Sequence, residues 1–164
     1  MDFFSRSPEQ TRRIGKRLGE VLEMGDVICL QGDLGAGKTT LVQGIAQGWG
    51  SLDSVSSPTF ILVNVYRRAD QSRGGVTQPL LFHMDAYRLD STPEAEELDL
   101  DSMLAQGALL VEWPERMNGL IPKERLWVNL EHIDEEEREM KFKATGKRYD
   151  ELLEVIRHST FGGK

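Results

Sequence analysis

The segment at residues 32–39 limits the folds open to this 164-residue chain more than any other part of the sequence. It reads GDLGAGKT and fits the pattern G-x-x-x-x-G-K-[ST], the Walker A phosphate-binding loop. From average residue frequencies, this pattern arises by chance in roughly one chain in a hundred of this length. The loop needs a buried strand before it and a helix after it, and apolar residues within 26–31 and 41–49 predict both. The alternative is a glycine-rich strand-to-helix turn that binds nothing.

Each part of this loop has a chemical task. The small residues at 35–37 let the backbone turn tightly and point N–H groups at phosphate oxygens. Lys38 supplies a positive charge for the β- and γ-phosphates, and Thr39 can offer its hydroxyl to Mg²⁺. Thr40 either contacts the α-phosphate or only begins the helix. We therefore predict a site for ATP or ADP with Mg²⁺. The sequence lacks the N-K-x-D pattern that reads guanine, which favours adenine.

The charge balance argues against strong direct binding to DNA or RNA. The chain has 20 basic and 27 acidic residues, a formal net charge of −7 and a pI of about 5.0. Proteins that hold nucleic acids by themselves usually carry a basic face, because phosphate contacts supply much of their affinity. We therefore expect no DNA partner and no strong grip on RNA by the isolated chain.

The sequence has no feature typical of a membrane or secreted protein. No stretch approaches the ~20 consecutive apolar residues of a membrane helix, and the first residues lack a basic segment followed by an apolar one. The single cysteine, Cys29, excludes an internal disulfide and a cysteine-based zinc site, and its place in a predicted strand favours a core position. We expect a cytoplasmic protein without membrane association.

Hydrophobic periodicity predicts alternating strands and helices. The first helix has Ser7 as N-cap, Pro8 at its first position and Gln10 where a capping box requires Glu or Gln, and Gly25 is expected to end it. The predicted strands are 26–31, 59–66, 80–84, 108–111, 125–133 and 139–145. Further helices are predicted over 41–49 and 147–158, and short helical pieces over 93–106.

This order of elements predicts an α/β protein. Together with the phosphate loop it indicates a P-loop NTPase-type fold with three layers, a mostly parallel central sheet and a β-hairpin whose loop covers 67–79. The length is that of a single domain. We expect one P-loop domain over 1–164, with a core over about 7–132 and a C-terminal strand-and-helix extension over 133–164.

Two acids follow buried strands at positions suited to Mg²⁺. Asp85 comes directly after LLFHM, and Glu112 directly after ALLV. The carboxyl ends of parallel strands face the ligand, so one carboxylate can hold Mg²⁺ while the other orients an attacking water. The sequence does not assign these two roles, and either acid could instead be a helix N-cap or a surface carboxylate.

Three other side chains have two interpretations each, and a fourth has one favoured interpretation. Thr59, in the segment SSPT, could sense Mg²⁺ and the γ-phosphate, or the segment could be a turn leading into a strand. Trp113 could stack on the base or ribose, or only pack in a half-buried position. Arg116 could neutralise phosphate charge, although an ion pair with a nearby acid is the more common role. His83 lies in a predicted buried strand, which favours a core imidazole with satisfied polar groups.

Four sequence blocks together resemble the TsaE (YjeE) family. They are GDLGAGKTT at 32–40, SPTF at 57–60, HMDAYRL at 83–89 and VEWPER at 111–116, in the order and at about the spacing of that family. Its members are small bacterial P-loop ATPases needed for threonylcarbamoyladenosine (t6A) modification of tRNA. The resemblance extends from the first helix to about residue 132, and the rest of the chain matches weakly.

The resemblance implies roles for the matching positions. Thr59 would be a switch-like threonine, Asp85 the Walker B aspartate, Glu112 an acid at Mg²⁺ and Trp113 a tryptophan near the nucleotide, so that Asp85, Glu112 and Thr59 are the catalytic candidates. The metal would be held by Thr39, Asp85 and Glu112. The nucleotide would be bound by Gly35, Ala36, Gly37, Lys38, Thr39, Thr40 and Trp113.

The resemblance also implies partners. The chain would act with the TsaB–TsaD pair, in which TsaD transfers the threonylcarbamoyl group to adenosine, and would reach tRNA only through that pair. Our first hypothesis is therefore an ATPase subunit of t6A synthesis, with low intrinsic activity that its partners stimulate. The second is a non-catalytic module whose bound nucleotide sets its affinity for a partner.

The third hypothesis is a small-molecule kinase. Such an enzyme would need an arginine-rich lid over its substrates. Only Arg67, Arg68 and Arg73 offer one, and the polar, glycine-containing stretch that holds them is typical of a hairpin loop.

Overall fold

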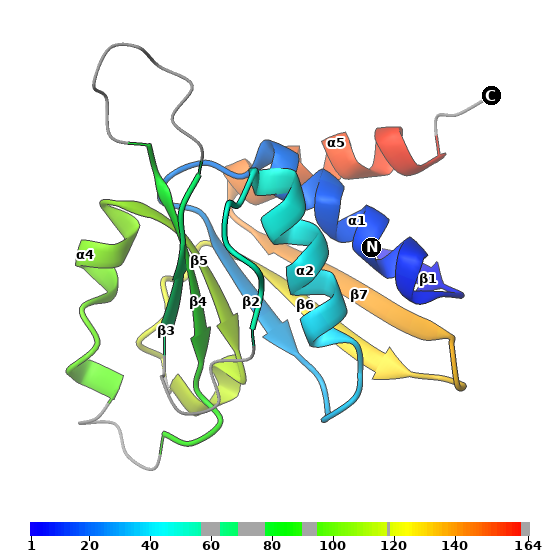
Figure 1. The fold of residues 1–164 in the computed structure, drawn as a ribbon, viewed down its shortest axis with the longest axis horizontal. Helices are drawn as coiled ribbons and strands as arrows, with labels where there is room; N and C mark the ends of the chain where they lie inside the picture. Colours follow the sequence, from blue (N-terminus) through cyan, green and yellow to red (C-terminus); the bar gives the residue numbers. More distant parts are fainter. Residues whose placement is uncertain (57–62, 69–77, 90–94, 118, 162–164) are drawn as a thin grey trace.

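A seven-stranded sheet forms the centre of the computed structural model, which describes residues 1–56, 63–68, 78–89, 95–117 and 119–161. The strands lie in the order β1-β7-β6-β2-β5-β4-β3 (Figure 1). Their bounds are β1 Asp2–Ser5, β2 Val27–Gln31, β3 Val63–Tyr66, β4 Leu80–Asp85, β5 Gly107–Glu112, β6 Arg125–His132 and β7 Arg138–Thr145.

The parallel part of this sheet lies at its centre. β6, β2, β5 and β4 are parallel to one another, whereas β7 and β1 at one edge and β3 at the other pair antiparallel to their neighbours. The predicted α/β class is confirmed, and the sheet is mixed because its edges are antiparallel. The carboxyl ends of β2, β5 and β4 meet at one end of the sheet, where a ligand is expected in an open α/β fold.

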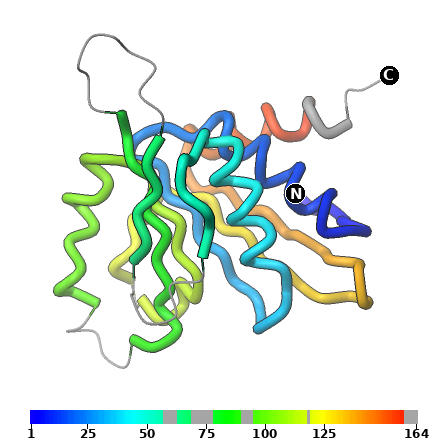
Figure 2. Tube along the Cα trace, in the orientation of Figure 1, coloured from blue at the N-terminus to red at the C-terminus, as the bar shows by residue number. Residues whose placement is uncertain are grey.

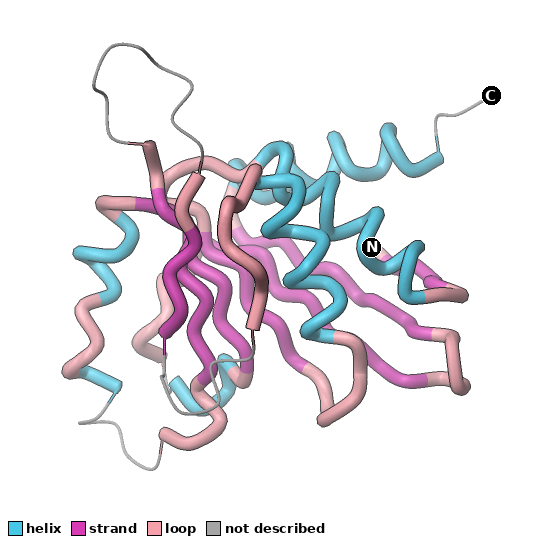
Figure 3. Tube along the Cα trace, viewed as in Figure 1, coloured by secondary structure: helices cyan, strands magenta, loops and turns pink. Residues whose placement is uncertain are grey.

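Helices and short turns cover both faces of the sheet, as Figure 3 shows. Ile28 and Leu30 of β2 belong to a buried cluster shared with α1, α2 and α5, while Val27 and Cys29 belong to a second cluster that includes Leu100 of α4. Alternate residues of one strand therefore enter opposite layers. The bounds are α1 Pro8–Val21, α2 Lys38–Trp49, α4 Leu100–Leu104 and α5 Lys147–Phe161, with a 3-10 turn over Pro114–Met117.

The start of α1 follows its predicted cap. Ser7 has extended backbone angles, and its Oγ accepts a hydrogen bond from the backbone N–H of Gln10 at 3.2 Å. The side chain of Gln10 turns back toward the N-terminus, but it accepts from the N–H of Arg6, at 2.8 Å, rather than from that of Ser7. The capping box is thus shifted by one residue.

The end of α1 differs from the prediction. The helix ends at Val21, whereas Gly25 was expected to end it. Asp26 explains the difference, because its carboxylate accepts the backbone N–H of Glu23 at 2.8 Å and closes a turn that competes with further helix. Gly25 instead lies in the turn before β2, and its N–H donates to the carbonyl of Gly107 at 2.9 Å.

Helix α1 lies directly against α2 because glycines face one another where the helices cross. Gly15 and Gly19 of α1 contact the backbone of α2, and Gly44 and Gly48 of α2 contact that of α1. A Cβ added to Gly48 would lie only 1.9 Å from the carbonyl oxygen of Lys16. This close approach fixes the position of α2, the helix that follows the phosphate loop.

The sequence prediction missed β1. This four-residue strand pairs antiparallel with β7, and the ring of Phe3 packs edge-on against Phe142 with 5.0 Å between centroids. In Figure 2 the blue N-terminal segment lies beside the orange trace of β7. A segment this short has too few residues for an alternating pattern, and only its pairing with a distant strand makes it extended.

Several predicted segments fall partly outside the described residues. Of the strand predicted over 59–66, the described part forms β3, and its antiparallel pairing with β4 agrees with the predicted hairpin, whose loop is described only at its ends. Within 93–106, the structure describes α4 and helical residues at 95–96. Every helix in the described ranges is too short or too polar to span a lipid bilayer.

Candidate functional site

The loop that joins β2 to α2 has the backbone geometry that its sequence predicts. Gly37 is the N-cap of α2 and has a φ of +102°, a left-handed conformation that favours glycine. The N–H of Ala36 donates to the carbonyl of Asp33 at 3.0 Å and closes the loop from within, where Ala36 is buried. Thr39 is exposed in the first turn of α2, where backbone N–H groups lack partners within the helix. The loop thus presents N–H donors at the positive end of a helix dipole, as an anion requires.

Lys38 is buried at this loop although it carries a charge. Its Nζ donates to the carbonyl oxygen of Gly32 and, at 2.9 Å, to that of Asp33, and it lies 4.7 Å from the centre of the Trp113 ring. Burial lowers the pKa of Lys38 below the ordinary lysine value, while nearby carboxylates, above all that of Glu112, act in the opposite direction. The ammonium group is therefore held between loop carbonyls, an aromatic face and acids.

Asp85 and Glu112 lie side by side at the ends of neighbouring parallel strands. They are the last residues of β4 and β5, and they pair in register. Side chains alternate along a strand, so Glu112 faces the same way as Leu110 and Asp85 the same way as Leu81. Those two leucines belong to the cluster under α1 and α2. Both carboxylates therefore point toward the face of the sheet on which α2 begins.

Asp85 is poorly solvated for a carboxylate. Burial raises its pKa above the usual aspartate value; the backbone N–H of Tyr87, which donates to Oδ1 at 2.9 Å, acts against this rise, and the charge of Glu112 adds to it. Two adjacent carboxylates with little access to water repel each other, so a cation beside them is electrostatically favoured.

Glu112 is buried and is held by a neighbouring histidine. His83 Nε2 lies 2.7 Å from Glu112 Oε2, and His83 Nδ1 lies 2.9 Å from the hydroxyl of Tyr66. His83 is therefore a core imidazole with satisfied polar groups, as its sequence position favoured. One of its partners is a candidate site residue, and nothing in the sequence revealed that contact.

Trp113 has a backbone conformation that is costly for a large side chain. Its φ is +56°, and in the described part of the chain it is the single non-glycine residue with a positive φ. Its N–H donates to the carbonyl of Leu30 in β2 at 3.3 Å, and its ring lies 4.9 Å from that of Tyr87. This conformation turns the half-buried indole toward Lys38 and the loop.

The phosphate loop, the two acids and Trp113 converge on one cavity of about 270 Å³. Ala36 is buried and lines a neighbouring cavity instead of this one. Thr59 lies outside the described residues, so the structure does not test its position. The residues that line the cavity are Leu34, Gly35, Gly37, Lys38, Thr39, Thr40, Asp85, Glu112, Trp113 and Arg138.

The oxygen donors at this cavity fit Mg²⁺. The Thr39 hydroxyl and the carboxylates of Asp85 and Glu112 are hard oxygen ligands of the kind that Mg²⁺ prefers. No group of three or more His, Cys, Asp or Glu within the described ranges could hold a metal ion by itself. An ion here would need phosphate oxygens as further ligands, which is the usual arrangement when Mg²⁺ binds together with a nucleotide.

Arg138 lines this cavity, although sequence reasoning gave it no role in the site. It begins β7, and a Cβ added to Gly37 would lie 3.7 Å from its Nε. Its Nη1 donates to the carbonyls of Asp134, Glu135 and Glu137 in the β6–β7 turn, at 2.8, 3.3 and 2.9 Å. In the sequence Arg138 is one charge in a mixed run, and only the hairpin brings it over the phosphate loop.

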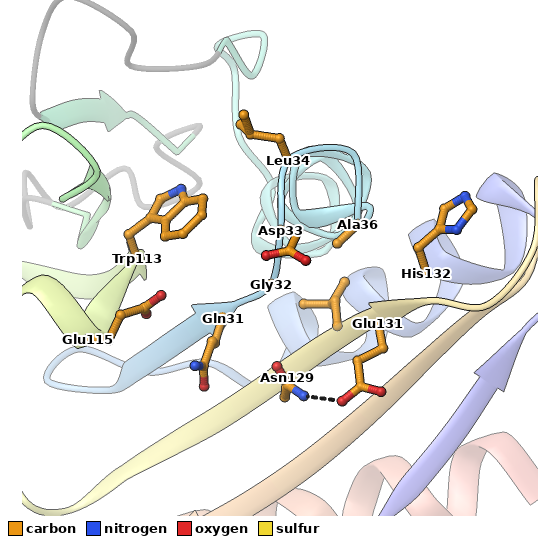
Figure 4. A pocket seen from close by; sticks show the side chains of 11 residues that line it. Gln31, Gly32, Asp33, Leu34, Ala36, Trp113, Glu115, Asn129, Glu131 and His132 are labelled. Atoms are coloured by element: carbon orange, nitrogen blue, oxygen red, sulfur yellow. Dashed lines mark hydrogen bonds between the residues drawn. The ribbon is translucent and has the colours of Figure 1, made fainter.

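A larger cavity of about 460 Å³ shares Trp113 as a wall (Figure 4). Figure 4 shows Glu115 beside the indole, with Asn129 and Glu131 of β6 across from them. Asn129 Nδ2 donates to Glu131 Oε1 at 2.8 Å. The cation, the threonines and the strand-end acids of the smaller cavity do not line this one. The candidate catalytic groups therefore converge on the smaller cavity.

Two further residues, Arg116 and Cys29, make contacts that support the structure. The guanidinium of Arg116 lies 5.5 Å from the centre of the Tyr87 ring, where it makes a cation–π contact at the edge of the site. Cys29 is fully buried in β2, and burial raises the pKa of its thiol to about 12. Cys29 is thus a core residue, as predicted.

Comparison with known proteins finds matches to this chain in one family. A family model described as "Threonylcarbamoyl adenosine biosynthesis protein TsaE" matches residues 5–140. The tRNA threonylcarbamoyladenosine biosynthesis protein TsaE of Bacillus subtilis is 41% identical over 151 residues, which cover 92% of this chain and 89% of that protein. The protein of the same name from Streptomyces coelicolor is 36% identical over 93% of this chain and 89% of its own length.

A solved structure has the same fold. The crystal structure of Bacillus subtilis YdiB superposes with a TM-score of 0.77 and 34% sequence identity. The match covers 98% of this chain and 95% of that one, so it includes the antiparallel edges of the sheet as well as its parallel centre.

Proposed function

This chain belongs to the TsaE family, as its four sequence blocks predicted, and on that premise we propose that it binds and hydrolyses ATP as an accessory subunit for t6A synthesis. Family membership gives it a role in the threonylcarbamoyladenosine modification of tRNA. ATP hydrolysis and action with the TsaB–TsaD pair are the further parts of the proposal. The observation that carries them is the convergence of Lys38, Asp85 and Glu112 on one cavity at the start of α2.

In this proposal each lining residue has a distinct task. The N–H groups of the loop and the Nζ of Lys38 donate to phosphate oxygens, with Lys38 exchanging its loop carbonyls for the nucleotide. Thr39 and one of the two acids hold Mg²⁺, which when bound neutralises charge on the β- and γ-phosphates. The other acid orients the attacking water. We assign Mg²⁺ to Glu112, as the family resemblance implies, and its second oxygen, which accepts no hydrogen bond from any described residue, would be available to the ion.

The structure argues against the kinase hypothesis, because two of the three arginines that could form a lid lie far from the phosphate loop. Arg67 pairs with Asp53 at 2.9 Å, and Arg68 lies 3.8 Å from the centre of the Trp49 ring and donates to the Trp49 carbonyl. Both arginines follow β3, at the end of the sheet opposite to Asp85, because β3 and β4 are antiparallel. Neither can reach the phosphate loop. Arg73 lies outside the described residues.

ATP turnover by the purified chain, alone and with the TsaB–TsaD pair, tests this proposal. We expect slow turnover by the chain alone and faster turnover with the pair. Lys38→Ala should abolish nucleotide binding or turnover, because it removes the loop cation. Glu112→Ala should reduce Mg²⁺-dependent hydrolysis more than ADP binding. Normal turnover by Lys38→Ala would exclude this loop as the site, and a pair that neither binds nor changes turnover would exclude the partnership.

The same variants separate an ATPase from a nucleotide-dependent interaction module. A Glu112 variant that binds ATP without hydrolysing it should fail to support t6A formation in a reconstituted reaction. If that variant supports t6A formation at the normal rate, hydrolysis is incidental and the module hypothesis is correct. The chain would act in both cases as one domain in the cytoplasm, where it would meet tRNA through its partners.

A further inference from the structure

We propose that His83 and Tyr66 are positioning residues that hold the carboxylate of Glu112 in the orientation needed at the cavity of about 270 Å³ beside the phosphate loop, here called the phosphate cavity. This inference rests on the proposed function, because it assigns the groups behind one of the proposed catalytic residues. The three side chains are almost fully excluded from solvent, with exposures of 1% for His83, 2% for Tyr66 and 5% for Glu112. Polar groups this deeply buried are stable only when they bond to one another.

The sheet places these three residues on a diagonal. Where β3 pairs with β4, Asn64 lies opposite His83, so Tyr66 lies two residues further along β3 on the same face. Where β4 pairs with β5, Asp85 lies opposite Glu112, so His83 lies two residues back along β4 on the same face. Diagonal neighbours of this kind are within reach of long side chains. The result is the chain of contacts from Tyr66 Oη to His83 Nδ1 and from His83 Nε2 to Glu112 Oε2, at 2.9 and 2.7 Å.

Hydrogen-bond chemistry gives this chain a direction. An ionised carboxylate only accepts, so the proton between His83 and Glu112 is carried by Nε2. In the neutral ring Nδ1 is then an acceptor, which requires the Tyr66 hydroxyl to donate to it. Tyr66 therefore selects the tautomer of His83 that can donate to Glu112. The hydroxyl has a single proton, and the carbonyl of Ser56 is its other possible acceptor, at 3.3 Å. That carbonyl already accepts from Asn64 Nδ2 at 2.9 Å, and the contact with His83 Nδ1 is the shorter one, so the geometry favours donation to His83.

This arrangement holds one oxygen of Glu112 and leaves the other for the cavity. Oε2 is occupied by His83, and Oε1 accepts no hydrogen bond from any described residue. Groups behind a catalytic or metal-binding side chain fix its orientation, and removing them typically costs about 10–100-fold in activity or metal affinity. His83 and Tyr66 do not line the cavity, so their effect on the reaction would pass through Glu112.

Tyr66→Phe and His83→Gln test this inference, with Tyr149→Phe as the matched control. Tyr149 is also a buried tyrosine with a hydrogen-bonded hydroxyl, which accepts the N–H of Val27 at 2.8 Å, but it lies on α5 and lines none of the cavity at the loop. The measurements are kcat and KM for ATP, the Kd of ADP with and without Mg²⁺ by calorimetry, and Tm. Glu112→Gln and the His83→Gln/Glu112→Gln double variant complete a cycle.

We expect Tyr66→Phe and His83→Gln to lower kcat about 10–100-fold, with KM within about twofold of the unmodified chain. Their Kd for ADP should rise only when Mg²⁺ is present. Tyr149→Phe should lower Tm and leave kcat and both Kd values unchanged. The double variant should be no slower than Glu112→Gln alone, because both changes remove one function.

The inference is overturned if folded Tyr66→Phe and His83→Gln match Tyr149→Phe in kcat and in Mg²⁺-dependent ADP affinity. If His83→Gln does not fold, Tyr66→Phe decides, since it keeps the aromatic ring and its packing. Absence of turnover in the unmodified chain, both alone and with the TsaB–TsaD pair, would refute the proposed ATPase. The positioning role would then be decided by the calorimetric comparison of Tyr66→Phe with Tyr149→Phe.

Discussion

At the scale of single residues, the site consists of groups in conformations that isolated side chains would avoid. Lys38 is buried with its charge, Trp113 has a positive φ, and Asp85 and Glu112 share a poorly solvated corner. Each of these features costs stability unless surrounding structure enforces it. Their concentration around one loop is what distinguishes this corner of the molecule from the rest of its surface.

Arg138 is the second cation of the phosphate cavity, and its removal should weaken nucleotide binding. We expect Arg138→Ala to raise the Kd for ADP about tenfold, because a charge-assisted hydrogen bond contributes ~1.5 kcal/mol or more. Lys141→Ala is the matched control, since Lys141 lies on the same strand, pairs with Glu131 and Glu139, and does not line the cavity. Calorimetric titration with ADP makes the comparison, and equal Kd values for the two variants would refute the prediction.

Cys29 should be unreactive in the folded chain. Burial raises its pKa to about 12, so the thiol stays protonated where an exposed cysteine, with a pKa of ~8.5, forms the thiolate. Ellman's reagent at about pH 8 should label Cys29 only after denaturation. The folded state also binds this proton more tightly than the unfolded state. Cys29 therefore contributes a loss of stability as pH rises from ~8.5 toward 12, and none below that range.

Cys29→Ala removes this contribution. Its free energy of unfolding should start lower, because a buried side chain is truncated, but it should fall less steeply between about pH 9 and pH 11. Urea unfolding at several pH values measures how the free energy of unfolding changes with pH for the unmodified chain and for Cys29→Ala. Parallel slopes, or rapid labelling of the native thiol, would contradict the assignment.

At the scale of elements, the crossing of α1 and α2 sets the position of the phosphate loop. Glycine within a helix usually lowers its stability by ~1 kcal/mol relative to alanine. Here four glycines allow backbone contact between two helices, and an added Cβ at any of them would overlap the backbone of the other helix. A Gly→Ala substitution, which usually stabilises a helix, is therefore expected to destabilise the chain at this interface.

Gly48→Ala should destabilise the chain by roughly 1–3 kcal/mol, because the new Cβ would overlap the carbonyl of Lys16 and force the helices apart. Glu20→Ala in α1 is the control, since Glu20 is exposed and the change should stay within about 0.5 kcal/mol. Urea unfolding measures both variants. A Gly48→Ala protein as stable as the unmodified chain would mean that α2 can shift at little cost.

Strand pairing decides which side chains meet at the site. Strands β3, β4 and β5 are each recognisable by their apolar residues, but alternation along one strand does not say which strand lies beside it. The observed register aligns Asp85 with Glu112 and brings His83 between Glu112 and Tyr66. A slip of one residue between β4 and β5 would reverse the side-chain faces of these two strands relative to each other and would separate Asp85 and His83 from Glu112.

At the scale of the whole molecule, the net charge of −7 disfavours direct binding of the isolated chain to RNA. We expect the purified chain to bind tRNA no more tightly than nonspecific complexes, with a Kd above ~10⁻⁶ M at physiological salt. Filter binding of tRNA by the chain alone, by the TsaB–TsaD pair and by the mixture measures this. Submicromolar binding by the isolated chain would show that a local surface outweighs the overall charge.

Much of the molecule follows from the sequence because the deciding interactions are local. The phosphate loop needs glycine at Gly37, where φ is +102°, and Ser7 caps α1 through a hydrogen bond to the third residue after it. Asp85 and Glu112 end their strands as their positions in the sequence indicated. These are short-range requirements of backbone geometry, so a single segment carries the whole signal.

Contacts between distant segments could not be predicted in this way. β1 is extended because β7 pairs with it, α1 ends early because Asp26 closes a turn, and Arg138 reaches Gly37 because a hairpin folds back. The sequence alone determined the phosphate loop, its flanking strand and helix, the two acids and the family. Tertiary structure decided which groups stand behind and above them, because the energy of a long-range contact depends on the packing of the whole chain and no single segment encodes it.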